Sequence, residues 1–195
     1  MKTEWPFATF ARAASLLLLV LLLALPAALH AQDYTYTTSG GRITITGYHG
    51  AGGAVTIPSA INGLPVTRIG DRGFRFLTRL TNITIGNSVT SIGSYAFASC
   101  SNLTSVAVGN SVARIENAAF ENCFSLTNLT IPKSVTSLGD WAFYHNSNLA
   151  SVYFQGNAPA RGLGVFDGDI KATVYYLPGS KGWGPTFGGR PTVSY

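Results

Sequence analysis

The sequence predicts a repeat solenoid that is rich in β-structure, with short helical or 3₁₀ turns, a short parallel sheet and a cap at each end. Three observations predict it: a period of 23 residues over four consecutive units, apolar residues at matching positions in every unit, and a charged fraction of only 11% together with 22 glycines. A fixed period of this kind is typical of repeat architectures, in which each unit buries its apolar face only against its neighbours. We therefore expect one continuous stack of units.

Residues 1–31 have the layout of a secretory signal peptide. Basic residues precede an apolar run at residues 16–25, and a proline and several small residues follow it. We expect cleavage after Ala31, or a few positions earlier near Ala28. An uncleaved membrane anchor is the structural alternative, but a spanning helix needs about 20 apolar residues and this run is shorter. The sequence predicts a secreted or cell-surface protein, and the Ala/Leu-rich leader favours a bacterial source.

The charge of the chain argues against several partners. The formal net charge of +5 falls to about +4 once residues 1–31 are removed. This charge is scattered, whereas nucleic-acid binding proteins usually concentrate Lys and Arg in one stripe. We therefore expect no nucleic-acid partner, and no membrane insertion after the leader is cleaved.

Four full units follow one another without insertion or deletion. They begin at Ile69, Ile92, Ile115 and Leu138, after an irregular first unit that starts at residue 55. The matching apolar columns include Phe74, Phe97, Phe120 and Phe143; Leu80, Leu103, Leu126 and Leu149; and Ile83, Val106, Leu129 and Val152. Stacked units turn such columns into ladders of like side chains along the axis of the solenoid.

Each unit contains one strand signal and one turn signal. The stretch Leu80–Ile85 fits an L-x-x-L-x-L pattern, whose last part is a short strand with alternate residues inward, and the strands of successive units form a parallel sheet. The preceding stretch, such as residues 95–100, places its apolar residues three apart, which predicts one helical or 3₁₀ turn opposite the sheet.

The unit I-G-x-x-A-F-x-x-C-x-x-L-T-x-[IV]-T-I-[GP]-x-S-V-T-x resembles the BspA-like class of leucine-rich repeats. The resemblance covers residues 55–160 and departs at Leu77 and Asn146, where the class often has Cys, and after Phe154. It implies a leucine-rich-repeat fold and a surface or secreted protein, of bacteria or some protists, that contributes to adhesion or binds other macromolecules. It implies no enzymatic activity and leaves the ligand open.

Both flanks of the repeats are predicted to be caps, because the raw ends of a sheet expose unpaired backbone groups. Residues 32–54 predict a β-hairpin around Ser39 and two glycines. Residues 161–195 predict a strand followed by a turn-rich segment in which Trp183 and Phe187 cover the last repeat.

Cys100 and Cys123 occupy the same position in adjacent units. Stacking at about 4.8 Å brings their Cα atoms into the range of about 4.4–6.8 Å that a disulfide requires. However, their Cβ atoms point the same way, and unbonded cysteines are also commonly buried. The sequence favours two buried thiols and leaves a bridge open.

The mature chain lacks a recognisable catalytic or metal-binding constellation. His49 and His145 lie in unrelated segments, and a nucleophile, base and acid that converge are not visible in the pattern. The segment 167–169 resembles a fragment of a calcium loop but is better interpreted as a turn, since calcium needs six or more oxygen ligands. We expect no enzyme activity, no cofactor and no metal.

Binding is expected on the concave face, where residues between the buried strand positions point outward. These candidate residues are Asn82, Thr84, Ser105, Asn128, Thr130, Ser151 and Tyr153. Small hydroxyl and amide side chains suit sugars or a protein backbone, and Tyr153 adds the only aromatic platform in these rows. An unused, solvated sheet would carry the same small polar residues.

Arg72, Arg75 and Arg79 form a secondary candidate site. Their spacing of three and four residues places them together if the segment is helical. They would serve either solubility or an anionic partner.

We therefore expect a macromolecule-binding or adhesion module with a protein or glycan ligand. The sheet offers on the order of 200 Å², whereas a standard interface needs about 800 Å² per partner. Binding is then weak and multivalent, or it recruits the caps and rim loops. The alternative is a structural envelope or matrix component that acts through weak self-association.

Overall fold

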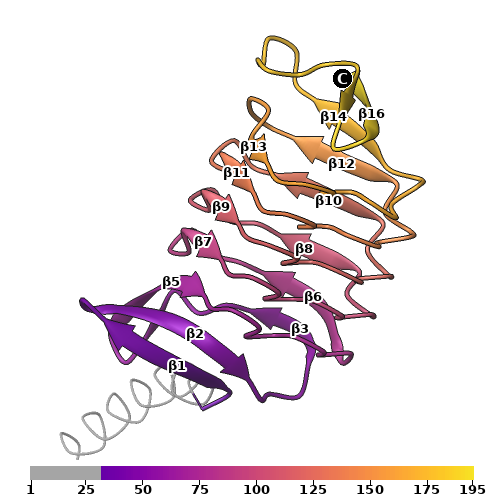
Figure 1. Cartoon of the computed structure of the whole chain (residues 1–195). Coiled ribbons are helices and arrows are strands. Elements are labelled where there is room, and N and C mark those ends of the chain that lie inside the picture. The colour runs from indigo at the N-terminus through magenta and orange to yellow at the C-terminus, as the bar shows by residue number, and fades with distance from the viewer. Residues whose placement is uncertain (1–31) are drawn as a thin grey trace, which may run out of the picture.

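The computed structural model describes residues 32–195, so the predicted signal peptide at residues 1–31 lies outside the described residues. Successive coils of the chain stack along one axis, with a hairpin at the N-terminal end and the C-terminus at the other (Figure 1). This part of the chain contains strands and turns and no helix, so none of its segments is a helix able to span a bilayer. The fold is the repeat solenoid with parallel sheets that the sequence predicts.

The N-terminal end of the stack is a β-hairpin. Strands β1 (Tyr34–Ser39) and β2 (Arg42–Tyr48) pair antiparallel through Gly40 and Gly41, whose φ angles are 54° and 70°. Two consecutive positive φ angles match the twist of hairpin strands, and glycine adopts them without steric cost. The other edge of β2 pairs parallel with the first coil, so the hairpin covers the raw end of the stack.

One parallel sheet runs along the stack, in the order β2-β5-β7-β9-β11-β13, and its strands beyond β5 have two residues each. Its strands after the hairpin are β5 (Leu64–Ile69), β7 (Ser91–Ile92), β9 (Arg114–Ile115), β11 (Ser137–Leu138) and β13 (Ala160–Arg161). A two-residue strand β4 (Ala60–Ile61) folds back antiparallel on β5. Partners such as Ile92 and Ile115 are one repeat apart, so the sheet follows the sequence period directly.

Longer strands form a second side of the solenoid, which we call the long-strand face. They are β3 (Gly53–Thr56), β6 (Leu80–Thr84), β8 (Ser105–Ala107), β10 (Asn128–Ile131), β12 (Ser151–Phe154), β14 (Thr173–Tyr176) and β16 (Arg190–Ser194). Hydrogen bonds join β3-β6-β8 in one sheet and β10-β12-β14-β16 in another, and β15 (Thr186–Phe187) pairs antiparallel with β16.

A ladder of turns forms the remaining side, and here the expected helical or 3₁₀ turn is wrong. In the second full unit Tyr95 and Ser99 have φ angles of 57° and 61°, which no right-handed helix contains. The N–H groups of Tyr95, Phe97 and Ser99 leave their own coil and donate to carbonyls of the next coil at 2.7–2.9 Å. The intervening Ala96 and Ala98 donate back three residues within the coil. Alternate backbone N–H groups therefore donate within the turn and across to the next coil, without a helix. We call this side of the solenoid, formed by residues 71–76, 94–99, 117–122, 140–145 and 163–168, the turn ladder.

The core is a column of stacked phenylalanine rings. Phe74, Phe97, Phe120, Phe143 and Phe166 follow one another at centroid separations of 5.0, 5.1, 5.7 and 5.4 Å, and all are buried. The three inner rings, Phe97, Phe120 and Phe143, therefore bury both faces against the rings of adjacent coils, which is the stabilisation by neighbours that a solenoid requires.

The stack continues beyond residue 160. Phe166 extends the ring column, and β14 pairs with β12 as each earlier long strand pairs with its neighbour. The pairing of Ser151 with Thr173 is a step of 22 residues, one fewer than the repeat period. Residues 161–176 thus form another coil, and the closing segment begins after it.

Aromatic side chains close the C-terminal end. Trp183 stacks on Tyr176 at 5.1 Å and also contacts Phe154 and Phe187 at 5.0 Å each. Phe187 is 6% exposed and meets the last ring of the column, Phe166, at 6.4 Å. Trp183 and Phe187 therefore cover the end of the repeats, as the sequence predicts.

Candidate ligand-binding surface

The long-strand face presents two rows of outward side chains. Along β10, Asn128 and Thr130 are exposed whereas Leu129 and Ile131 are buried, because successive side chains of a strand point to opposite sides. The seven residues that the sequence analysis selected all lie in these rows: Asn82, Thr84, Ser105, Asn128, Thr130, Ser151 and Tyr153.

The strand register aligns these rows along the axis of the stack. Asn82 pairs with Ser105, and Asn128 pairs with Ser151 in the same row. Hydroxyl and amide groups therefore recur at the strand spacing of about 4.8 Å. This arrangement can donate and accept hydrogen bonds along an extended ligand.

Tyr153 is not the only aromatic side chain of these rows. Tyr175 of β14 pairs with Tyr153, and their rings stack at 4.9 Å. Tyr195 meets Tyr153 and Tyr175 edge-on at 5.4 and 6.2 Å. The sequence predicts the strand that carries Tyr175. Its alignment with Tyr153 does not follow from the 23-residue period, because the two residues are 22 positions apart.

A groove opens where the hydrogen-bonded ladder of the long-strand face is interrupted, between β8 and β10. Pro132 lies directly after β10, at the position of Gly86 and Gly109 in earlier coils, and proline has no N–H to donate. The groove encloses about 390 Å³ and includes the candidate residues Ser105, Asn128 and Thr130 in its lining, with Gln155 at one side. The structure therefore gathers three of the seven residues around one depression.

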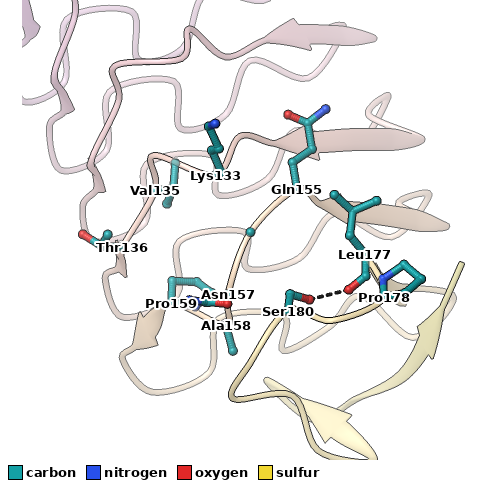
Figure 2. A pocket seen from close by; sticks show the side chains of 11 residues that line it. Lys133, Val135, Thr136, Gln155, Asn157, Ala158, Pro159, Leu177, Pro178 and Ser180 are labelled. Atoms are coloured by element: carbon teal, nitrogen blue, oxygen red, sulfur yellow. Dashed lines mark hydrogen bonds between the residues drawn. The ribbon is translucent and has the colours of Figure 1, made fainter.

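A larger cavity of about 470 Å³ lies at the rim, among the loops that follow β10, β12 and β14 (Figure 2). Its lining includes Lys133, Gln155, Ala158 and Leu177, and Ser180 donates a hydrogen bond to the Leu177 carbonyl across its edge. Gln155 lines both depressions, so the groove and the rim cavity adjoin.

The rim cavity was not predicted, although the sequence contains a signal for it. Val89, Val112 and Val135 form a buried column, and Ala158 continues that column with a shorter side chain. Replacing a buried valine by alanine leaves unfilled space. The departure of the fourth unit from the repeat pattern after Phe154 is therefore the sequence signal for this cavity.

The arginines of the first full unit do not form one cluster through helical spacing. Arg72 and Arg75 place their guanidinium groups 5.6 and 5.2 Å from the ring centroid of Tyr95 in the next coil. Arg79 donates instead to the carbonyl of Gly50, at 3.3 Å. The structure therefore brings Arg72 and Arg75 together around Tyr95 and gives Arg79 a separate contact.

Arg68, one residue before the first unit, has a structural role. Its guanidinium bonds both carboxylate oxygens of Glu116 at 2.7 and 2.9 Å and one oxygen of Asp71 at 3.0 Å. The hydrogen bonds to Glu116 are the main reason that the pKa of Arg68 is raised. This guanidinium links coils two repeats apart and is occupied by internal carboxylates.

Cys100 and Cys123 are both buried and both free. Their Sγ atoms donate to the carbonyls of Phe74 and Phe97, at 3.0 and 3.3 Å. Burial raises the pKa of Cys100 to about 12 and that of Cys123 well above its usual value. Because the thiolate is the reactive form, neither cysteine is poised as a nucleophile.

The residues considered for catalysis or calcium do not converge. His49 and His145 are exposed, and His145 stacks on its neighbour Tyr144 at 4.2 Å. Asp167 is exposed whereas Asp169 is fully buried. Residues 32–195 hold no group of three or more His, Cys, Asp or Glu side chains that could bind a metal ion.

Stacked coils with in-register strands, a buried aromatic column and outward polar rows define a leucine-rich repeat solenoid. Residues 67–179 match the BspA type leucine rich repeat region in 6 copies, and the chain belongs to this family. The match extends past residue 160, in agreement with the coil at residues 161–176. Members of this family are in general binding and adhesion scaffolds.

Solved bacterial leucine-rich repeat proteins have the same fold. A leucine-rich repeat protein of T. pallidum is 26% identical, with a TM-score of 0.59 over 75% of this chain and 85% of that one. One from Bacteroides capillosus is 32% identical, with a TM-score of 0.58 over 64% of this chain and 95% of that one. One from Bacteroides ovatus, 23% identical with a TM-score of 0.55 over 74% and 48%, supports the fold alone. No curated protein matches the chain in sequence.

Proposed function

We propose that the mature protein is a non-catalytic binding or adhesion module that acts outside the cytoplasm and contacts a protein or a glycan through its long-strand face. The observation that carries this proposal is the position of Gln155, which lines both the groove and the rim cavity. The outward rows, the groove and the cavity then act as one contact surface. The general role of the family as a binding scaffold supports this function.

The size of the surface predicts the kind of binding. Five strands, β6 to β14, at about 4.8 Å and with about 10 Å of strand length each offer roughly 250 Å². A standard interface buries about 800 Å² per partner. The rim cavity and the tyrosine cluster of Tyr153, Tyr175 and Tyr195 must therefore contribute, and affinity on a cell or matrix surface is expected to come from several copies acting together.

The extracytoplasmic location rests on the predicted leader at residues 1–31 and on the bacterial relatives. The absence of catalysis rests on the described side chains: two distant, exposed histidines and two buried thiols offer no activated nucleophile. Arg72 and Arg75 are a secondary contact for an anionic partner, with the solubility of the chain as their alternative role.

Arrays of glycans and extracellular-matrix proteins test the proposal with the mature chain. The double variant Thr130→Arg with Tyr153→Ala blocks the groove and removes one ring of the tyrosine cluster, so we expect it to abolish the strongest array signal. Thr38→Arg on the exposed hairpin strand is the matched control and should bind normally. Unchanged circular dichroism shows that the variants are folded. Binding that survives the double variant would move the site away from the long-strand face.

Self-association is the alternative function, and the C-terminal end of the stack gives it a specific basis. Val193 on β16 is 44% exposed, Tyr195 directly after β16 is 49% exposed, and Leu177 is 37% exposed. Exposed apolar residues at the end of a sheet are a site for contact with another copy. A molar mass that rises with protein concentration in light scattering, together with no array binding, would favour this alternative.

A further inference from the structure

The turn ladder contains a column of equivalent positions with two small members, Ala118 and Gly164. The Trp141 indole packs over Gly164, where an added Cβ would lie 2.7 Å from its Cδ1 and Nε1 atoms. Arg72, Tyr95, Ala118 and Trp141 occupy equivalent positions in successive coils and have φ angles of 60°, 57°, 52° and 54°. Equal backbone angles direct these side chains the same way, so they stack along the axis. Ala118 has no side chain beyond Cβ, which leaves a slot between the Tyr95 and Trp141 side chains.

This slot is a cavity of about 270 Å³ lined by Tyr95, Ala118, Glu121, Trp141 and Tyr144. Ala118 is 2% exposed and lies at the floor, whereas Trp141 is 44% exposed and borders the opening. The cavity therefore combines three aromatic side chains with one carboxylate. Aromatic faces and a carboxylate attract a cation and disfavour an anion.

The carboxylate of Glu121 is available to a ligand. Its Oε1 accepts a hydrogen bond from Asn122 Nδ2 at 3.3 Å. Within residues 32–195 the ion pairs involve Arg68 with Asp71 and Glu116, so Glu121 has no cationic partner there. A bound cation would give the Glu121 carboxylate an ion-pair partner.

The spacing of the coils fits a planar cation. In the same three coils the rings of Phe97, Phe120 and Phe143 are separated by 5.1 and 5.7 Å. One coil step therefore has the height of a planar group, and the Arg72 guanidinium, one step from Tyr95, lies 5.6 Å from that ring, inside the range of about 6 Å for cation–π contact. A guanidinium is flat and stacks on aromatic faces, whereas an ammonium is compact and strongly hydrated.

The chain itself contains the same contact on the opposite side of Tyr95. Arg72, one coil before Tyr95, places its guanidinium carbon 5.6 Å from the centroid of that ring. Ala118 is one coil after Tyr95, so a ligand guanidinium in the slot would repeat this arrangement between Tyr95 and Trp141.

The surroundings of the slot fit a polypeptide. Large apolar side chains from the turn segments are exposed around this side of the solenoid: Phe76, Phe124, Leu163 and Ile170. Exposed apolar patches mark interaction sites, and protein interfaces are enriched in aromatic and arginine side chains. We propose that the slot receives an arginine side chain of a protein partner. This site lies on the turn ladder, so its test is independent of the proposed site on the long-strand face.

Titration of the mature protein with N-acetyl-arginine amide tests the proposal, followed by the NMR signal of the Trp141 indole N–H. We expect saturable binding that is at least about fivefold weaker for N-acetyl-lysine amide and for the neutral isostere N-acetyl-citrulline amide. Equal binding of the arginine and citrulline compounds, or no binding of either, would overturn the proposal.

Two variants locate the binding. Ala118→Tyr fills the slot with the side chain that this column already carries at Tyr95, so it should fold and lose binding. Glu121→Gln keeps the shape and should weaken binding about fivefold, while Asp33→Asn on the N-terminal hairpin removes the same charge elsewhere and should not. Binding that persists in a folded Ala118→Tyr protein, or equal losses in Glu121→Gln and Asp33→Asn, would contradict this site.

Discussion

Asn146 donates its backbone N–H to Oδ1 of Asp169, one coil further along the stack, at 2.5 Å. The coil before repeats this bond, since the N–H of Cys123 donates to Oδ1 of Asn146 at 2.7 Å. Cys100, Cys123, Asn146 and Asp169 occupy one buried column at equivalent positions. Asn146 and Asp169 thus each accept a hydrogen bond from the backbone N–H one coil before. Cys100 and Cys123 do not, so the corresponding N–H groups bond to other acceptors. Asp169 ends the column, and its Oδ2 is buried without a hydrogen-bond partner.

The first prediction is that stability depends on pH through Asp169. Burial is the main cause that raises the pKa of Asp169 to about 7. In the unfolded chain an aspartate titrates near about 3.9. Between these values the folded protein holds a proton that the unfolded chain has released, so the free energy of unfolding falls as the pH rises from about 4 to about 7.

Asp169→Asn removes this dependence. The new side chain keeps the acceptor for Asn146, and its amide can donate to the Phe166 carbonyl as Asn146 Nδ2 donates to Phe143. We expect the variant to gain about 3 kcal/mol over the native protein at pH 8 relative to pH 4.5, measured by urea unfolding. Asp33→Asn, at the opposite end of the stack, is the control. Equal pH profiles for the native protein and Asp169→Asn would contradict the prediction.

The second prediction concerns the cysteines. Because Cys100 and Cys123 are buried thiols with raised pKa values, the native protein should not react with a thiol reagent at pH 8 within minutes. Unfolding in guanidinium without reductant should then release both thiols, which are the 2 cysteines of the chain. A protein that shows none after unfolding would contain the disulfide that the sequence left open.

The sequence predicts most of the fold because the apolar columns of the four full units follow one period. The turn ladder was misread since apolar residues three apart fit a helical turn as well as consecutive β-turns. The difference lies in the positive φ angles of Tyr95 and Trp141, which side-chain type does not indicate, and in cross-coil hydrogen bonds. The coil at residues 161–176 was also missed, because it is one residue shorter on the long-strand side.

The candidate site was predicted as rows and not as cavities. The alternation of polar and apolar residues along the strand is enough to predict that Asn128 and Thr130 point outward, as they do. A groove, in contrast, depends on where the hydrogen-bonded ladder breaks and on which columns lose volume, as at Ala158. The slot at Ala118 has the same origin, since a short residue matters only when the backbone stacks it between Tyr95 and Trp141.

The third prediction tests the ring column. Phe120 is fully buried and stacks on Phe97 and Phe143 at 5.1 and 5.7 Å. Phe120→Ala removes contacts with two coils at once, so we expect a loss of about 3–5 kcal/mol in urea unfolding. Phe124→Ala, at a 43% exposed residue of the same unit, should cost less than about 1 kcal/mol. Similar losses for both variants would mean that the column does not carry the stability of the stack.

The fourth prediction separates packing from function at the rim cavity. Ala158→Val restores the column of Val89, Val112 and Val135 and fills part of the space. Cavity filling commonly adds about 1 kcal/mol, so we expect the thermal midpoint to rise by about 2–4 °C. Ala160→Val on the exposed strand β13 is the control and should leave it unchanged.

The same variant then reports on the ligand found with the arrays. If the cavity is part of the contact surface, Ala158→Val gains stability and loses binding, because space that the core leaves open is the space that the ligand fills. A variant that is stabilised and still binds fully would make the cavity a packing defect at the end of the repeats, and would confine the proposed site to the groove and the tyrosine cluster. A destabilised variant would mean that the neighbouring loop already packs as closely as a shorter side chain allows.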